Sequence, residues 1–428
     1  MMRRVALGAG LVAAGALGVG WVIARRLTAP GTRRYDLTVR EVERDGDGSL
    51  IVLDRTRQTA AEGAYNLWFE NGGWAQLSED VLDRGPTLIA RRVTSTASGL
   101  TLRAGDHVSW SGIYYATPHD ASLHAHDITI DTPAGPAPAW RIDGDSGRST
   151  WAIHLHGLGS VRAGTLRAVL AATERGYTSL VISYRADGEG PGVGNGRSTL
   201  GFTEADDAAA AIEYAMRHGA RQVVLFGWSM GAAIALQLAH HPSYRRSIAG
   251  LVLDSPVLDW TEVIKANCTR SGLPSAAGSL AIPWLTLRPL ARMVGLPESI
   301  PIRSFDWTVR AEELTAPTLI LHGTHDDSVP IRLSQALRDA RPGLVSLETF
   351  EAGHTLSWNS DPDRWQSAVI AWLPGVPRGG GLSGPRRRDR DGVSHRAMVS
   401  ENDQELTQKD DTARWLLTSL PSSSCSGN

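Results

Sequence analysis

The amino-acid sequence predicts an α/β protein whose main sheet is mostly parallel and is covered by helices on both faces. From residue 128 onward, short apolar runs alternate with helix-forming stretches. Such an alternation is typical of parallel strands joined by crossover helices. A Gly-Trp-Ser-Met-Gly turn at 227–231 also joins an apolar run directly to an Ala- and Leu-rich run, as expected where a strand leads into a helix.

Composition bounds the class of protein. The chain has 428 residues, 42% of them hydrophobic and 21% charged, which suits one large α/β domain with an appendage or two ordinary domains. A formal net charge of −2 gives no reason to expect a nucleic-acid partner. Cys268 and Cys425 form a single potential pair, so neither a disulfide framework nor a metal site is indicated. We expect no cofactor, and the sequence leaves the oligomeric state open.

Residues 5–24 carry no charge and lie between two Arg pairs. As a helix this run would be about 30 Å long, which matches the apolar core of a bilayer. The sequence therefore predicts a single-pass anchor in the cell membrane within residues 1–30, with a cleaved signal and secretion, or a buried helix, as the alternatives. Arginines on both flanks leave its orientation undetermined. Because a polar stretch follows from Thr28, we expect the anchor to contribute nothing to the catalytic core.

Residues 31–122 are expected to form a small β-rich accessory region, because short alternating runs are separated by Gly and Asp clusters. Asn71-Gly72-Gly73 between aromatic residues is a hairpin signal. His124 and His126 could begin a metal site, but exposed loop histidines are the favoured interpretation since no further ligands follow at metal spacing.

Residues 123–375 are expected to hold the catalytic domain. Its predicted strands are 128–133, 138–143, 150–156, 178–184, 222–228, 250–255, 317–322 and 345–350. Its predicted helices are 164–175, 204–218, 230–241, 331–340 and 361–373. The Gly-rich segment 188–196 matches no phosphate-binding pattern and is interpreted as a loop.

Ser229 is the candidate nucleophile. In a strand–turn–helix connection this tight, flanking glycines remove side chains that would collide with the neighbouring elements, and the serine is held out at the end of the strand. Met230 opens the following helix, so its N–H has no partner within that helix and can stabilise a developing oxyanion.

A serine hydroxyl needs a base, and the base needs a group that orients it. His354, after the last predicted strand, is the candidate base. Asp326, after the strand that ends near Gly323, is the candidate acid, with Asp327 and the strand-end Asp254 as rivals. The order Ser, Asp, His favours a triad.

The loop after the strand at 150–156 is expected to supply the second oxyanion donor. The run His-Leu-His-Gly-Leu-Gly-Ser at 154–160 ends that strand with small residues, which lets backbone N–H groups face the site. Leu158 is the candidate donor. His156 precedes the nucleophile in the chain and is expected to shape the loop instead of acting as the base.

Together, His-Gly-Leu-Gly at 156–159, Gly-Trp-Ser-Met-Gly at 227–231, the run from His322 to Pro330 and Gly-His at 353–354 resemble the α/β-hydrolase superfamily over about residues 128–374. Within it, the chain is similar to bacterial membrane-associated hydrolases with a short β region before the catalytic domain. The resemblance implies an eight-stranded sheet, a triad of Ser229, His354 and Asp326, and no cofactor. The oxyanion loop departs from the His-Gly-Gly-Gly form of lipases.

The favoured function is a serine hydrolase that cleaves a small-molecule carboxylic ester, or a related acyl bond, through an acyl-enzyme. A serine peptidase, an acyltransferase or a thioesterase could use the same triad. A non-catalytic membrane-tethered binding protein is a further alternative of another class. The substrate and its leaving group do not follow from the sequence.

Residues 261–315 exceed the usual length of an α/β connection and predict a helical cap over the carboxyl edge of the sheet. Within it we expect Leu287, Leu290 and Val294 to share one helix face that lines an acyl pocket or packs on the sheet. The segment 376–428 is Gly- and Arg-rich, then polar, and is predicted to be disordered.

Overall fold

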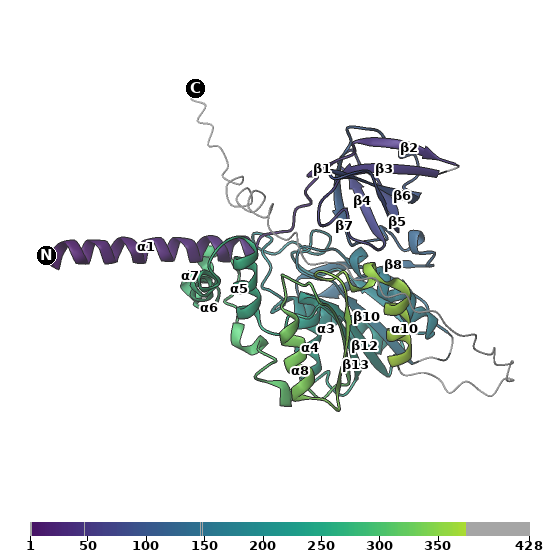
Figure 1. The fold of residues 1–428 in the computed structure, drawn as a ribbon. Helices are drawn as coiled ribbons and strands as arrows, with labels where there is room; N and C mark the ends of the chain where they lie inside the picture. Colours follow the sequence, from purple (N-terminus) through teal and green to yellow (C-terminus); the bar gives the residue numbers. More distant parts are fainter. Residues whose placement is uncertain (1, 47, 146, 148, 374–428) are drawn as a thin grey trace, which may run out of the picture.

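The computed structural model describes residues 2–373 apart from 47, 146 and 148, and only the helical backbone of residues 2–14. The predicted tail at 376–428 lies outside these residues. The described chain forms an N-terminal helix and two sheets, one above the other in Figure 1.

The larger sheet has eight strands in the order β15-β14-β13-β12-β10-β11-β9-β8. All neighbours from β15 to β11 pair in parallel, while β9 pairs antiparallel with both β11 and β8. This confirms the mostly parallel eight-stranded sheet. Its strands are β8 (His126–Thr132), β9 (Gly135–Ile142), β10 (Thr150–Leu155), β11 (Thr178–Ile182), β12 (Gln222–Trp228), β13 (Ile248–Asp254), β14 (Thr318–Gly323) and β15 (Val345–Phe350).

Helices cover both faces of this sheet. Because successive side chains of a strand point to opposite faces, each central strand contributes to two cores. Val223 and Leu225 of β12 join one apolar core together with α3 (Glu204–Arg217), α4 (Met230–His240) and α8 (Ile331–Ala340). Val224 and Phe226 join a second core with α2 (Leu166–Glu174) and α10 (Pro362–Trp372). Both faces of the central strand are therefore buried, as the continuous apolar runs predict.

The smaller sheet has seven strands in the order β1-β7-β4-β5-β6-β3-β2, all paired antiparallel. The expected hairpin at residues 71–73 joins β4 to β5 and is confirmed. The strands are β1 (Leu37–Thr38), β2 (Glu41–Asp45), β3 (Gly48–Asp54), β4 (Tyr65–Phe69), β5 (Trp74–Asp83), β6 (Leu88–Thr96) and β7 (His107–Ser111).

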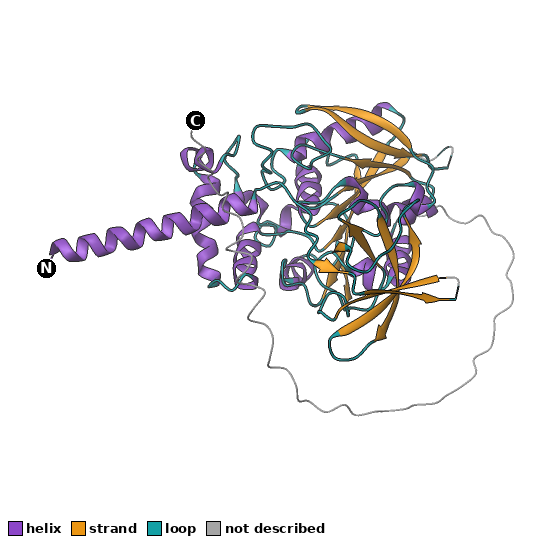
Figure 2. Cartoon of the chain, turned by 90° about the horizontal axis from the view of Figure 1, so that it is seen from above, coloured by secondary structure: helices purple, strands orange, loops and turns teal. Residues whose placement is uncertain are grey.

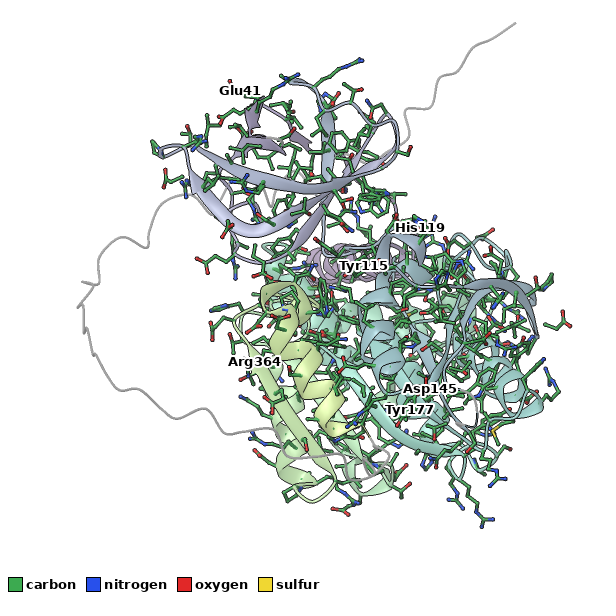
Figure 3. All side chains as sticks on the ribbon, turned by 90° about the vertical axis from the view of Figure 1, so that its right-hand side faces the viewer. Glu41, Tyr115, His119, Asp145, Tyr177 and Arg364 are labelled. Atoms are coloured by element: carbon green, nitrogen blue, oxygen red, sulfur yellow. The ribbon has the colours of Figure 1, made fainter. Side chains whose placement is uncertain are left out.

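The two sheets are joined closely at Asn359, in the short helix α9 (Ser357–Ser360). Its side-chain amide donates to the carbonyls of Ala64 and Gly112, and its backbone carbonyl accepts from the Ala64 N–H at 2.8 Å. Nearby, the ring of Trp358 contacts Tyr114 and Tyr115, and Figure 3 shows Tyr115 at the boundary between the sheets. The smaller sheet is thus packed against the segment that follows His354.

The cap consists of α5 (Trp260–Arg270), η3 (Ser275–Ala281), α6 (Ile282–Thr286), α7 (Arg288–Val294), η4 (Ile302–Phe305) and η5 (Ala311–Glu313). One expectation for it is wrong. Leu287 has an extended backbone between α6 and α7 and is 54% exposed, whereas Val294 is fully buried. Pro289 lies in the first turn of α7, where its ring fits, so a new helix begins after Leu287 and the proposed single face does not form.

The N-terminal helix α1 (Met2–Leu27) extends away from the body at its first turns and packs on the cap with its last turns (Figures 1 and 2). Among the residues whose side chains are described, no helix is long and apolar enough to cross a membrane. Much of the predicted span at 5–24 lies outside those residues, so the membrane anchor stays a prediction.

The expectation that this segment contributes nothing to the catalytic core is wrong. Ala24 and Thr28 are fully buried, and Ala24 belongs to the same apolar core as the cap. The Arg197 guanidinium donates to the carbonyl of Arg25 at 2.6 Å, which ties the end of α1 to the catalytic domain.

Candidate active site

Ser229 lies between β12 and α4 with φ of 52° and ψ of −109°, a conformation that non-glycine residues rarely adopt. Both glycines that flank Ser229 are required, because neighbouring backbone leaves no room for a side chain at either position. A Cβ on Gly227 would lie 2.6 Å from the backbone of Ala232, and a Cβ on Gly231 would lie 2.1 Å from the carbonyl of Leu155. The Ser229 N–H donates to the carbonyl of Asp254 at 2.9 Å, which holds the strained turn in place.

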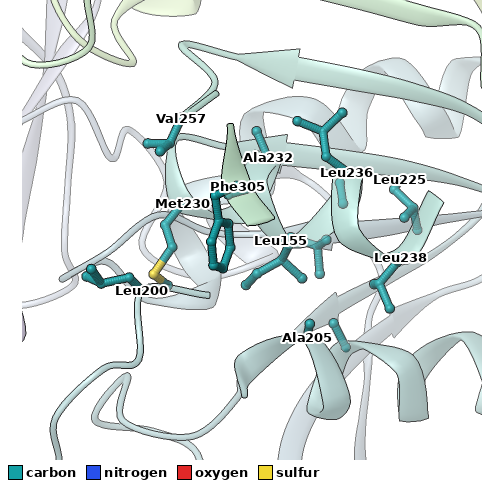
Figure 4. Close-up of a cluster of buried hydrophobic side chains, with 14 of the residues drawn as sticks. Leu155, Leu200, Ala205, Leu225, Met230, Ala232, Leu236, Leu238, Val257 and Phe305 are labelled. Atoms are coloured by element: carbon teal, nitrogen blue, oxygen red, sulfur yellow. The ribbon is translucent and has the colours of Figure 1, made fainter. Parts of the chain in front are cut away.

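Met230 turns its side chain into the core, so only its backbone faces the site. It is 2% exposed and packs with Leu200 and Phe305, as Figure 4 shows. Because Met230 is the first residue of α4, its N–H has no carbonyl of its own helix to bind. This amide is therefore suitable as an oxyanion donor.

The structure brings the three predicted side chains together. His354 Nε2 lies 2.9 Å from Ser229 Oγ, and His354 Nδ1 lies 2.7 Å from Asp326 Oδ2. With its proton on Nδ1, the imidazole can donate to Asp326 and accept the serine proton at Nε2. His354 is partly exposed and the Asp326 side chain is fully buried.

Asp326 is held as a carboxylate. Its Oδ1 accepts from the N–H groups of Ser328 and Val329 at 2.9 and 2.7 Å, and His322 lies 3.2 Å from Oδ2. Burial by itself raises the pKa of Asp326, but the hydrogen bonds from His322, His354 and Val329 outweigh it and hold that pKa well below its ordinary value.

The rival carboxylates lie elsewhere. Asp327 is 53% exposed and has Arg57 at 4.0 Å as its ion-pair partner. Asp254 is buried, accepts from the indole N–H of Trp365 at 3.0 Å, and its Oδ1 has no hydrogen-bond partner among the described residues. Burial raises the pKa of Asp254 to about 6. Neither carboxylate contacts His354 Nδ1 as Asp326 does.

The loop after β10 lies directly on the nucleophile. A Cβ on Gly157 would be 3.3 Å from the Cβ of Ser229, so a larger residue there would crowd the serine. Leu158 follows at the edge of the same cavity. His156 stacks on Tyr184, and its ring nitrogens contact the Gly157 carbonyl and Asp187, each at 3.0 Å. Both nitrogens of His156 are thus engaged in holding the loop.

A cavity of about 320 Å³ lies over Ser229 and His354. One of its walls comes from the smaller sheet and the segment after it, through residues 110–113 and Gln58. Arg167 of α2 also lines it. This guanidinium is buried, donates to the Asn359 side chain and to the carbonyls of Gly164 and Thr355, and stacks on Trp228.

Sequence reasoning missed these wall residues. Trp110 and Gln58 are more than a hundred residues from Ser229 in the chain, and no motif marks them. Within the described part of the chain, no group of three His, Cys, Asp or Glu residues could hold a metal ion, and His126 instead lies 3.3 Å from Asp143.

A family model of the alpha/beta hydrolase family matches residues 152–368, about half of the chain. The chain therefore belongs to the alpha/beta hydrolase family, and it is a hydrolase by class. A second model, described as a domain of unknown function (DUF8805), matches residues 38–111, which span the smaller sheet.

Two uncharacterized proteins of Mycobacterium tuberculosis, MT2364 of strain CDC 1551 and Rv2307c of strain H37Rv, are each 28% identical over 261 residues, which is 59% of this chain and 70% of theirs. Among solved structures, the Pyrococcus furiosus esterase Pf2001 is 22% identical over 60% of this chain and 95% of its own, with a TM-score of 0.47. A thermophilic esterase from Thermogutta terrifontis is 22% identical over 58% of this chain and 98% of its own, with a TM-score of 0.41.

Proposed function

We propose that this protein is a serine hydrolase that cleaves carboxylic esters through an acyl-enzyme formed on Ser229. The observation that carries the proposal is the pair of distances at His354, 2.9 Å to the serine hydroxyl and 2.7 Å to Asp326. An imidazole between a strained, partly exposed serine and a buried carboxylate is the arrangement that activates a serine hydroxyl.

In the first step Ser229 Oγ attacks the ester carbonyl while His354 Nε2 takes the hydroxyl proton. The carbonyl oxygen becomes an oxyanion, which the N–H groups of Met230 and Leu158 stabilise. The intermediate then collapses, the C–O bond to the alcohol breaks, and His354 returns the proton to the departing alkoxide. A water molecule, activated by the same histidine, attacks the acyl-enzyme and releases the acid and Ser229.

A fluorophosphonate probe tests the nucleophile. Wild-type protein should be labelled at Ser229, and Ser229→Ala should lose both labelling and turnover, with a fall in kcat of at least about 10³-fold. The variant should keep its fold because it loses only a hydroxyl at a cavity wall. Labelling that persists in Ser229→Ala would place the nucleophile elsewhere.

A matched panel of an ester, a thioester and a peptide with the same acyl group tests the bond that is cleaved. We expect the ester to give the highest kcat/KM. Preference for the peptide would indicate a serine peptidase, preference for the thioester a thioesterase, and transfer of the acyl group to an added alcohol an acyltransferase. A wild-type protein that is neither labelled nor active would indicate a binding protein on this fold.

We also propose that α1 anchors the protein in the cell membrane. The uncharged run at 5–24 between Arg pairs supports this, and the anchor then lies in the part of the run before Gly20, because Gly20 and Ala24 pack on the catalytic domain. Sedimentation of the full chain with membranes, and recovery of an intact N-terminus from them, would support the anchor. A mature N-terminus beyond Ala29 would show a cleaved signal instead.

A further inference from the structure

A second cavity, of about 480 Å³, lies between the end of α1 and the cap. This volume is within the range of small-molecule pockets. Its lining is mainly apolar and comes from elements about 240 residues apart in the chain. The apolar side chains that face it are Val19, Val22, Ile23 and Leu27 from α1 and Ile264 and Leu273 from the cap.

This cavity shares one lining residue, Leu158, with the catalytic one. The residue lines both cavities, and its N–H is the proposed second oxyanion donor. The chain after α1 also touches the same loop, because a Cβ on Gly31 would lie 2.6 Å from the Cα of Gly159. The apolar space therefore lies on the other side of Leu158 from the cavity over Ser229.

The wall formed by α1 is built into the catalytic domain. A Cβ on Gly20 would lie 2.1 Å from the carbonyl of Leu280, so the helix backbone rests directly on η3. The Trp21 indole donates to the carbonyl of Met293, and the Arg25 guanidinium donates to the carbonyl of Val294, each at 3.3 Å. These contacts fix the position of Val19 and Val22 relative to α5.

The opposite wall is connected to the catalytic acid. Asn267 of α5 lines the cavity and donates to the carbonyl of Ser328 at 3.0 Å, and the Ser328 N–H in turn donates to Asp326. The cavity is thus bounded by the oxyanion loop on one side and by a helix tied to the Asp326 loop on another.

Val19 and Val22 remain 42% and 37% exposed although they face this cavity. Apolar side chains that remain open to water gain free energy when an apolar group covers them. An alkyl chain fits this chemistry, since most of the lining is apolar; its polar residues are Arg26, Asn267, Arg270 and Ser271.

We propose that this cavity binds the acyl chain of the substrate, and that α1 is one of its walls. The proposal rests on the proposed ester hydrolysis and narrows its substrate class to esters of medium- or long-chain fatty acids. The alcohol portion then lies in the cavity over Ser229, against Trp110 and the smaller sheet.

The test is a series of p-nitrophenyl esters from acetyl to dodecanoyl, with the full chain kept in a cholate-type detergent that has no alkyl chain to compete. In wild-type protein kcat/KM should rise along the series, by at most about fourfold per buried methylene. Val22→Trp should fill part of the cavity and lower the ratio of dodecanoyl to acetyl kcat/KM by at least about tenfold.

Leu17→Trp is the matched control. Leu17 is also an exposed apolar residue of α1, at 54%, but it does not line the cavity. The control should keep the wild-type ratio. Should Val22→Trp fail to fold, which loss of acetyl ester hydrolysis would reveal, Val19→Phe provides the same obstruction from the more exposed position.

Product inhibition gives an independent readout. Dodecanoate should inhibit acetyl ester hydrolysis competitively in wild-type protein, and its inhibition constant should rise at least about tenfold in Val22→Trp. The acyl site would be overturned if both cavity variants kept the wild-type ratio of dodecanoyl to acetyl kcat/KM, or if dodecanoate inhibited Val22→Trp and wild-type protein equally. Labelling of Ser229 would still support ester hydrolysis in that case. Absence of labelling and of acetyl ester hydrolysis would instead overturn the proposed function.

Discussion

Asp326→Asn should inactivate the enzyme by reversing the tautomer of His354. Asp326 Oδ1 accepts from the N–H groups of Ser328 and Val329 at 2.9 and 2.7 Å. In the variant the amide oxygen keeps these two bonds, because an NH₂ group facing two N–H donors would leave all of them unsatisfied. The new NH₂ group then faces His354 Nδ1, which must accept instead of donate. The imidazole proton moves to Nε2, where it blocks transfer from Ser229.

The size of the effect follows from this change. The backbone contacts of residue 326 survive, so the fold should persist while the base is lost. Holding the histidine of a serine triad in the wrong tautomer lowers kcat by about 10⁴-fold, which corresponds to about 5.5 kcal/mol of activation free energy.

The assay is kcat for an acetyl ester, with circular dichroism as the check on folding. Asp327→Asn is the matched control, since that side chain is 53% exposed and faces Arg57. It should change kcat by less than about threefold. A folded Asp326→Asn variant with near wild-type kcat, or a larger loss in Asp327→Asn, would refute the assignment of the acid.

Three further predictions concern the surroundings of the site. Trp110→Ala should lower kcat/KM for esters of bulky alcohols about tenfold relative to methyl esters, because Trp110 lines the cavity over Ser229; equal losses for both would contradict this. Asn359→Ala should lower the free energy of unfolding by about 3 kcal/mol in urea titrations, since it removes the side-chain donor of two carbonyls and one acceptor of the buried Arg167; a loss below about 1 kcal/mol would refute that role. Asp254 has a pKa of about 6 in the folded protein, above its ordinary 3.8, so protonation of this carboxyl stabilises the folded state. The stabilisation is complete below about pH 4 and is lost as the pH rises towards 6. Two pKa units correspond to about 3 kcal/mol, and Asp254→Asn should remove this fall in unfolding free energy; an unchanged pH dependence between 4 and 6 would contradict it.

The parts of the site that could be predicted are those held by local geometry. Gly227 and Gly231 are needed because neighbouring backbone lies within 2.7 Å of where their Cβ atoms would be, so the turn itself leaves a pattern in the sequence. Ser229, Asp326 and His354 each lie within four residues of the end of a strand, and the carboxyl ends of parallel strands meet at one edge of a sheet. Strand order therefore brings these side chains together without any knowledge of side-chain packing.

The walls of the site could not be predicted because they depend on docking between distant segments. Trp110 reaches the cavity because Asn359 binds the carbonyls of Ala64 and Gly112, and a single asparagine leaves no periodic pattern. Leu287 failed as a predicted pocket residue for a related reason. Helical spacing assumes an unbroken helix, whereas the chain adopts an extended conformation at Leu287 and begins a new helix with Pro289 in its first turn.

The glycines of α1 show the same limit and allow a last test. In the sequence, Gly15 and Gly20 look equivalent, as glycines of an apolar helix. In the structure a Cβ on Gly15 meets nothing within 4 Å, while one on Gly20 would lie 2.1 Å from the Leu280 carbonyl. Alanine favours a helix by about 1 kcal/mol over glycine, so Gly15→Ala should keep or raise the Tm of the full chain in detergent. Gly20→Ala must push α1 away from η3, at a cost of about 1–3 kcal/mol, and should lower both the Tm and the ratio of dodecanoyl to acetyl ester kcat/KM. Equal behaviour of the two variants would mean that α1 is attached to the catalytic domain without forming part of it.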